Sequence, residues 1–328
     1  MKKHIFVYLV IFGIIVIFLT MFHGINTNDE LTHKDKKVNN LLNCQHVSEL
    51  EEQAKQGRAS ALSELGFCYE TGQGVDKNYE KSFALYSRSA KQGYGNAQFN
   101  IGNAYRHGRG VTQDYQKAIE WYQKAAGQGI IKSQVVLGNM YISGQGVPVD
   151  SNKAIKWYVK AAQNNDTAAM NNLGNIYSDG VNIPTDNQRA EDWYLKAVAL
   201  GSMSARNSLG VFYGRGLGRH PDDRDKALPL VEASACQGYA LAQINLGSFY
   251  MENDGEVSVD YKKSYAWYYV AYINGARNVK NELNLLTKKM NKEELIDAKK
   301  MAAEYSQKYR SSPLENDIYK SQIECKYP

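Results

Sequence analysis

The side chains best suited to chemistry are few and scattered along the sequence. The histidines are His4, His23, His33, His46, His107 and His220. No His-Glu-x-x-His, Cys-x-x-Cys, Gly-x-Ser-x-Gly or phosphate-loop motif accompanies them. His220, Asp222 and Asp223 could hold a metal ion from one turn, but an ordinary polar turn is the better interpretation. We therefore expect no catalytic residue, no metal site and no cofactor.

The cysteines are Cys44, Cys68, Cys236 and Cys325. In an oxidising compartment they could form two disulfides, and the sequence alone leaves three pairings open. The alternative is a set of free thiols, as is normal in the cytoplasm. Which cysteines can pair depends on where the secondary-structure elements place them.

Those elements belong to an internal repeat. An aliphatic residue followed by glycine recurs with a spacing of 36 residues four times and 37 once. The glycines are Gly66, Gly102, Gly138, Gly174, Gly210 and Gly247. Three residues after them stand Tyr69, Tyr105, Tyr141, Tyr177, Tyr213 and Tyr250, and five residues before them Ala61, Ala97, Ser133, Ala169, Ala205 and Ala242. A fixed period of this length is typical of a solenoid.

Each repeated residue has a physical role. A glycine inside a helix costs about 1 kcal/mol relative to alanine, so its return in every unit indicates the close approach of a neighbouring helix. The Gly-x-Gly pairs that follow, such as Gly108 and Gly110, favour the left-handed conformation that ends a helix. A second helix then begins at a short acceptor side chain. The predicted N-caps are Asn78, Asp114, Asp150, Asp186, Asp223 and Asp260.

The second unit, Ala97 to Gly129, combines Ala-x-x-x-Ile-Gly-x-x-Tyr-x-x-Gly-x-Gly-Val with Lys-Ala-x-x-Trp-Tyr-x-Lys-Ala-Ala. This pattern resembles the Sel-one-like repeats, which are relatives of the tetratricopeptide repeats, from about Ala59 to Gly275. The resemblance implies an all-α, right-handed α/α superhelix (solenoid) of about six repeats. It also implies scaffold or adaptor roles, often in cell envelopes. Units four to six depart from the pattern, for example at Asn182 and Ile183.

The solenoid is expected over residues 44–278, with a half unit before the first full repeat. Residues 279–310 carry apolar side chains at helical spacing and should form a capping helix pair, and 311–328 should be a tail. Because solenoid units touch only their neighbours, Cys44 can reach Cys68, while Cys236 can reach a folded-back Cys325.

Residues 1–27 indicate a targeting segment. Lys2 and Lys3 precede an uncharged run from Ile5 to Phe22, which at ~1.5 Å per residue is long enough to cross a membrane. No small-residue cleavage site follows, so we favour an uncleaved signal anchor over a cleaved signal peptide. The body would then lie in the periplasm, anchored in the inner membrane, or be secreted there after cleavage. Residues 28–43 would be a polar tether.

The partner surface is expected on the first helices. Ala97, Ile101 and Ala104 mark the buried face of unit 2, so residues two positions further on should point roughly the opposite way. By resemblance to tetratricopeptide arrays, that face lines the concave side, where mixed amide and apolar groups suit an extended peptide or a partner helix. An ordinary solvated face is the alternative. The predicted contact residues are Phe99, Asn103, Arg106, Val135, Asn139 and Asn175.

The four tryptophans also recur at repeat spacing. This spacing favours packing between units over an aromatic cage for a ligand. The tryptophans are Trp121, Trp157, Trp193 and Trp267.

The net charge of +5 is spread thinly, which argues against nucleic-acid binding. The favoured function is an exported, non-enzymatic scaffold or adaptor for a protein partner. The first alternative is an immunity or inhibitor protein that neutralises a toxin delivered to the periplasm. The least favoured is a cell-wall enzyme or ligand receptor, because no set of converging polar groups is evident.

Overall fold

The computed structural model describes residues 44–251 and 259–309, and these residues are all-helical, as predicted. The predicted targeting segment, tether and tail lie outside them. None of the helices within these two ranges is long and apolar enough to cross a membrane. In order, the elements are η1 (Cys44–His46), α3 (Val47–Lys55), α4 (Ala59–Thr71), α5 (Tyr79–Lys91), α6 (Gly95–His107), α7 (Tyr115–Gly127), α8 (Ile131–Ser143), α9 (Ser151–Ala162), α10 (Thr167–Asp179), α11 (Asn187–Ala199), α12 (Met203–Gly214), η2 (Pro221–Lys226), α13 (Ala227–Cys236), α14 (Ala240–Met251), α15 (Tyr261–Ile273), η3 (Arg277–Val279), α16 (Lys280–Lys289) and α17 (Lys292–Lys308).

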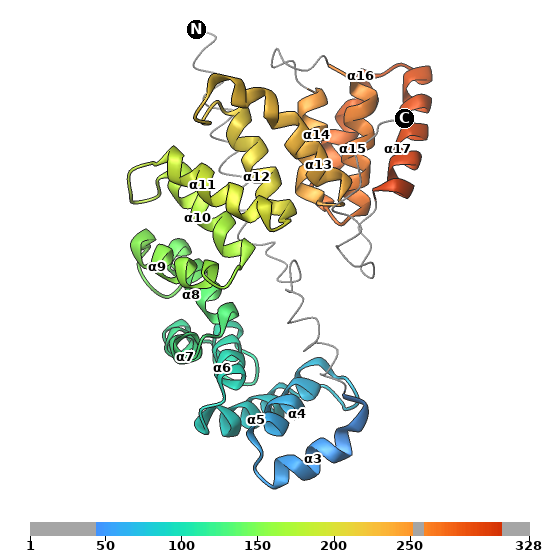
Figure 1. Cartoon of the computed structure of the whole chain (residues 1–328). Coiled ribbons are helices and arrows are strands. Elements are labelled where there is room, and N and C mark those ends of the chain that lie inside the picture. Colours follow the sequence, from blue (N-terminus) through green and yellow to red (C-terminus); the bar gives the residue numbers. More distant parts are fainter. Residues whose placement is uncertain (1–43, 252–258, 310–328) are drawn as a thin grey trace. The chain divides into compact units, whose positions relative to one another are not determined.

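Consecutive helices pack in pairs, and each pair packs on the next (Figure 1). The pairs from α4–α5 to α14–α15 coincide with the six predicted units, and α3 supplies the half unit before them. Each unit therefore has a first helix, which carries the repeated glycine, and a second helix. This order of contacts is that of a solenoid, which confirms the predicted fold.

Each first-helix glycine lies against a side chain of the second helix in its own unit. A Cβ added to Gly138 would stand 2.5 Å from the ring of Tyr158. In unit 5, Val231 takes the place of the tyrosine against Gly210. An alanine in these positions would force the buried ring, or Val231 in unit 5, to move. The equivalent tyrosine pairs are Gly66–Tyr86, Gly102–Tyr122, Gly174–Tyr194 and Gly247–Tyr268.

The ends of most helices follow the predicted signals. First helices α4, α6, α8 and α10 end at glycines in the left-handed conformation, Gly72, Gly108, Gly144 and Gly180. Among the second helices, α5, α7, α9, α11 and α15 begin at the predicted caps, whose side chains accept backbone N–H groups of the first turn. These caps are Asn78, Asp114, Asp150, Asp186 and Asp260.

The prediction for Asp223 is wrong. This residue lies inside η2, and α13 begins after Lys226 without a side-chain cap. Its carboxylate instead accepts the backbone N–H of His220 at 2.9 Å and pairs with the ammonium of Lys226 at 2.7 Å. In the altered turn of unit 5, the predicted capping carboxylate therefore bonds to residues of the turn itself and does not cap α13.

The tryptophans lie in the packing between helices, as expected. Trp267 is fully buried and contacts the rings of Tyr305 and Tyr309, at the end of α17. The other three are half-buried against the apolar clusters, and the ammonium of the lysine one turn further on lies over each indole. These pairs are Trp121–Lys124, Trp157–Lys160 and Trp193–Lys196.

The substitution Gly138→Ala tests the glycine contact. We expect it to lower the free energy of unfolding by about 1 to 3 kcal/mol, because the new methyl group displaces the buried Tyr158 ring. The matched control is Gly127→Ala, at a helical glycine with no atom within 4 Å of the added Cβ; it should be neutral or stabilising by up to ~1 kcal/mol. Urea unfolding followed by circular dichroism measures both. Equal effects at the two glycines would refute the contact's importance.

The caps make stability depend on pH. The backbone N–H of Lys117 lowers the pKa of Asp114, and that of Lys153 lowers the pKa of Asp150. Since the folded pKa lies below the unfolded value, the stabilisation is complete above about pH 4 and is lost as the pH falls through the folded pKa. Asp114→Asn with Asp150→Asn keeps the acceptor oxygens but removes the titration. The urea midpoint of the parent should therefore fall more steeply on acidification than that of the variant.

Candidate partner-binding surface

The three predicted asparagines occupy the same position in units 2, 3 and 4, one residue after the repeated glycine. Each accepts a hydrogen bond from the second-helix tyrosine that packs on that glycine. The hydroxyl of Tyr158 donates to Oδ1 of Asn139. The equivalent bonds are Tyr122 to Asn103 at 2.7 Å and Tyr194 to Asn175 at 2.7 Å. We call Asn103, Asn139 and Asn175 the asparagine row.

This bond fixes the orientation of each amide. Burial raises the pKa of Tyr122, Tyr158 and Tyr194 far above the ordinary tyrosine value, so these hydroxyls stay protonated and donate. A donating hydroxyl needs an acceptor, and only the oxygen of an asparagine amide can supply it. The Nδ2 groups must therefore point away from the tyrosines. Within residues 44–251 and 259–309, none of the three Nδ2 groups of the asparagine row has an acceptor.

The other three predicted contact residues are also engaged within the chain. Phe99 is half-buried, with its ring 5.7 Å from that of Tyr122. Val135 packs against the core of units 3 and 4. Arg106 donates from Nε to Oε1 of Gln145, in the turn of the next unit, at 2.8 Å.

The predicted opposite orientation is thus only partly correct. All six contact residues are half-buried, because a first helix packs on its own second helix and on the second helix of the previous unit. An angle measured on a single helix does not account for the second of these contacts. The six residues nevertheless lie on the first helices of successive units, α6, α8 and α10, and Nδ2 of Asn172 on α10 lies 3.4 Å from Oδ1 of Asn139 on α8.

The same surface has a positive charge balance. Helices α6, α8, α12 and α14 contain no aspartate or glutamate, whereas α6 carries Arg106 and α8 carries Lys132. The carboxylate of Asp179 at the end of α10 is paired with Arg215 at 3.5 Å. Desolvation and the charges of Arg106 and Arg109 lower the pKa of His107, which leaves this histidine neutral at pH 7.

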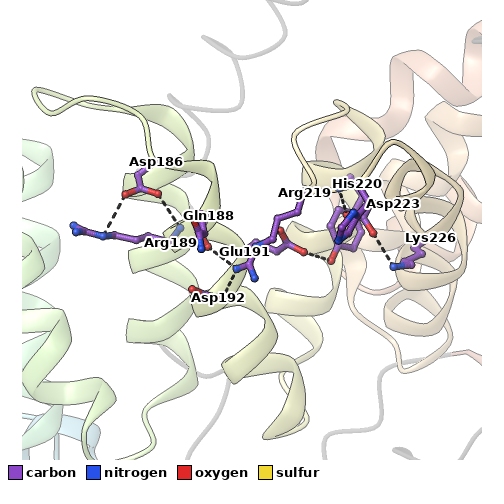
Figure 2. Close-up of polar contacts among 10 residues, drawn as sticks. Asp186, Gln188, Arg189, Glu191, Asp192, Arg219, His220, Asp223 and Lys226 are labelled. Carbon is purple, nitrogen blue, oxygen red and sulfur yellow. Dashed lines mark hydrogen bonds and ion pairs between the residues drawn. The ribbon is translucent and has the colours of Figure 1, made fainter.

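The turn around His220 is occupied by internal contacts. The Asp223 carboxylate faces the backbone of His220 and the ammonium of Lys226 (Figure 2). The hydrogen bonds from Lys226 and from the His220 N–H lower the pKa of Asp223. No group of three His, Cys, Asp or Glu side chains in the described part of the chain is placed to hold a metal ion.

A charged joint links units 4 and 5. Glu191 on α11 is buried, accepts a hydrogen bond from the Tyr213 hydroxyl at 2.9 Å and pairs with Arg219 at 3.1 Å (Figure 2). Arg219 also pairs with Asp192 and donates to the carbonyl of Gln188. The position of Glu191 is apolar in the other units, where it holds Phe83, Ile119, Ile155, Leu228 and Tyr265.

The Cys44–Cys68 disulfide is present and joins η1 to α4 across a sequence separation of 24 residues. Cys236 is buried at the end of α13. Its predicted partner, Cys325, lies outside the described residues, so that pairing stays a prediction.

A double-mutant cycle tests the tyrosine–asparagine bond. Asn139→Ala leaves the buried Tyr158 hydroxyl without an acceptor and should lower the free energy of unfolding by about 1 to 3 kcal/mol. Adding Tyr158→Phe should recover part of that loss, because no unpaired hydroxyl remains. Asn96→Ala, at an exposed position of α6, is the control and should have no effect. Additive losses in the double variant would contradict the pairing.

Removing the disulfide should have a local effect. Cys44→Ser with Cys68→Ser should destabilise the half unit by about 3 kcal/mol, given the length of the closed loop. Since solenoid units contact only their neighbours, hydrogen exchange followed by mass spectrometry should show lost protection in α3 and the start of α4. Unchanged protection in α3 would show that its packing alone holds it.

The comparisons with known proteins agree with this architecture. A family model described as Sel1 repeat matches residues 59–94, 95–130, 131–166, 167–202, 204–239 and 240–275. Among solved structures, a Sel1 repeat protein from Oxalobacter formigenes is similar at 29% identity and a TM-score of 0.61, over 70% of this chain and 96% of that chain.

Two further solved structures are less similar. The protective antigen c5321 of uropathogenic Escherichia coli shares 26% identity with a TM-score of 0.47, over 80% of this chain and 64% of that chain. Immunity protein Pa5087 from Pseudomonas aeruginosa shares 23% identity with a TM-score of 0.43, over 66% and 80%. No curated protein sequence matches the chain. The match of six consecutive repeats shows that the chain belongs to the Sel1 repeat family.

Proposed function

We propose that this chain is a non-enzymatic scaffold or adaptor that binds a protein partner on the first helices of units 2 to 4. The observation that carries the proposal is the asparagine row, which offers oriented amide N–H groups on a surface shared by successive units. Half-buried Phe99, Val135 and Ile142 add apolar area beside these amides. Such a combination suits recognition of a polypeptide better than that of a small molecule.

We also propose that the protein works outside the cytoplasm, held in the inner membrane by its N-terminal segment. The uncharged run from Ile5 to Phe22 supports this location. The Cys44–Cys68 disulfide adds support, because disulfides persist in oxidising compartments and are rare in the cytoplasm.

In-cell crosslinking of the tagged full chain, followed by purification and mass spectrometry, tests the binding function. The comparison is with a variant that places acidic side chains on the proposed surface, Asn100→Glu with Asn172→Glu. We expect one dominant protein to be captured by the parent and lost with this variant. A matched control, Gln123→Glu with Asn152→Glu, adds the same side chains to exposed positions of second helices α7 and α9 and should capture the partner normally.

The identity of the captured protein decides the narrower role. An assembly component would make the chain a scaffold, and a toxic enzyme would make it an immunity protein. Capture that is lost equally in both variants would place the binding surface elsewhere. No specific protein, with the bait folded by circular dichroism, would contradict a protein-binding function.

A further inference from the structure

We infer that the asparagine row binds the main chain of an extended, acidic peptide segment, with an acidic side chain of that segment next to Arg106. This inference rests on the proposed function and names the chemistry of the partner. It follows from the donors that the row exposes and from the charge of the first helices.

The donors come first. The hydroxyls of Tyr122, Tyr158 and Tyr194 hold the three Oδ1 atoms, so each asparagine can offer only N–H to a ligand. A ligand that satisfies the row must therefore supply acceptors. Main-chain carbonyls are the acceptors that every polypeptide carries at regular intervals.

The ligand must also be extended. In a helix the carbonyls are already bonded within the helix, apart from those of its last turn. An extended segment leaves its carbonyls free to accept hydrogen bonds from a binding surface. An extended chain advances ~3.3 Å per residue, so only a segment of several residues can reach all three asparagines.

The length of the row is set by the tyrosines. In unit 5 Val231 replaces the tyrosine, and Val211 stands where the asparagine would be. In unit 1 the Tyr86 hydroxyl donates to Glu70 instead, and the asparagine position holds Phe67. The amide donors and their orienting hydroxyls thus occur together in units 2 to 4, which limits the main-chain site to these units.

The positive charge of this surface favours acidic side chains in the bound peptide. Arg106 is half-buried, its Nε is held by the neutral Gln145, and no carboxylate of residues 44–251 and 259–309 pairs with it. Lys132 on the neighbouring first helix is exposed, and neither α6 nor α8 bears an acidic residue. The corresponding position in units 3, 4 and 5 is Ile142, Ser178 or Gly214, so the cation marks one end of the row and gives the bound segment a direction.

Selection from a random 12-residue peptide library displayed on phage, with the full chain as target, tests the inference. The most enriched peptide is synthesised in two forms, one as selected and one with every Asp and Glu replaced by Asn or Gln. We expect the selected form to be acidic. Fluorescence anisotropy then measures the binding of both forms to the parent and to three variants.

The first variant is Asn139→Asp, which keeps the acceptor for Tyr158 but removes the N–H donors. It should weaken both peptide forms by roughly threefold to tenfold, as expected for one lost hydrogen bond. Arg106→Gln should weaken only the acidic form, by a similar factor. Asn152→Asp, on the exposed face of α9, adds the same charge away from the row and should leave both affinities unchanged.

The two peptide forms distinguish the loss of the Asn139 N–H donors from the effect of the added negative charge. If Asn139→Asp weakened the acidic form alone, repulsion would explain it and the main-chain contact would be wrong. Unchanged binding to this variant, or failure of the library to yield any peptide, would also overturn the inference. A partner captured in cells would then still support the proposed function, through recognition of a folded surface.

Discussion

The contact between a first-helix glycine and a second-helix side chain, which is a tyrosine ring in five of the six units, is the constraint on which each unit depends. It brings the two helices closer than any side chain at the glycine would permit. It also carries the tyrosine hydroxyl across the unit, so that in units 2 to 4 it reaches the residue that follows the glycine. A packing requirement therefore determines where the polar groups of the surface lie and how they are turned.

The same constraint explains how the units differ. Where Val231 replaces the ring, no hydroxyl needs an acceptor, and the neighbouring position is the apolar Val211. The joint between units 4 and 5 carries an additional contact, through the buried Glu191 with Tyr213 and Arg219 (Figure 2). A buried carboxylate is tolerated there because the Tyr213 hydroxyl bonds to one oxygen and the Arg219 guanidinium forms an ion pair with the other. Units 4 and 5 thus add a polar contact to the ring contact of Tyr194 with Phe212, whereas Phe83 and Tyr105 meet through their rings at the joint of units 1 and 2.

Much of the fold could be predicted from the sequence, because its determinants are local and repeated. The period of the glycines identifies the units, and residues such as Asp114 and Gly108 mark the ends of helices. The prediction fails at Asp223 because its carboxylate bonds to His220 and Lys226 in an altered turn and does not cap the next helix. The hydrogen bond of Asn103 could not be predicted from a single helix, because its partner, Tyr122, lies 19 residues away on another helix. A signal was available: asparagine after the glycine and tyrosine 19 residues later occur together in units 2, 3 and 4 and are both missing in unit 5.

The ring contacts between Trp267 and α17, after the last repeat, limit where the number of repeats can change. Helix α17 packs along α15, and the rings of Tyr305 and Tyr309 cover the indole of Trp267, while the carbonyl of Tyr309 accepts hydrogen bonds from Gln243 and Asn274. The last unit is therefore fitted to this ending and not to another repeat. The first unit is likewise tied to its own beginning by the Cys44–Cys68 bond. Whole units can be gained or lost by duplication or deletion only between these two ends, where every boundary joins one repeat to the next. Repeats added in the middle would thus lengthen the array and leave the packing at its two ends unchanged.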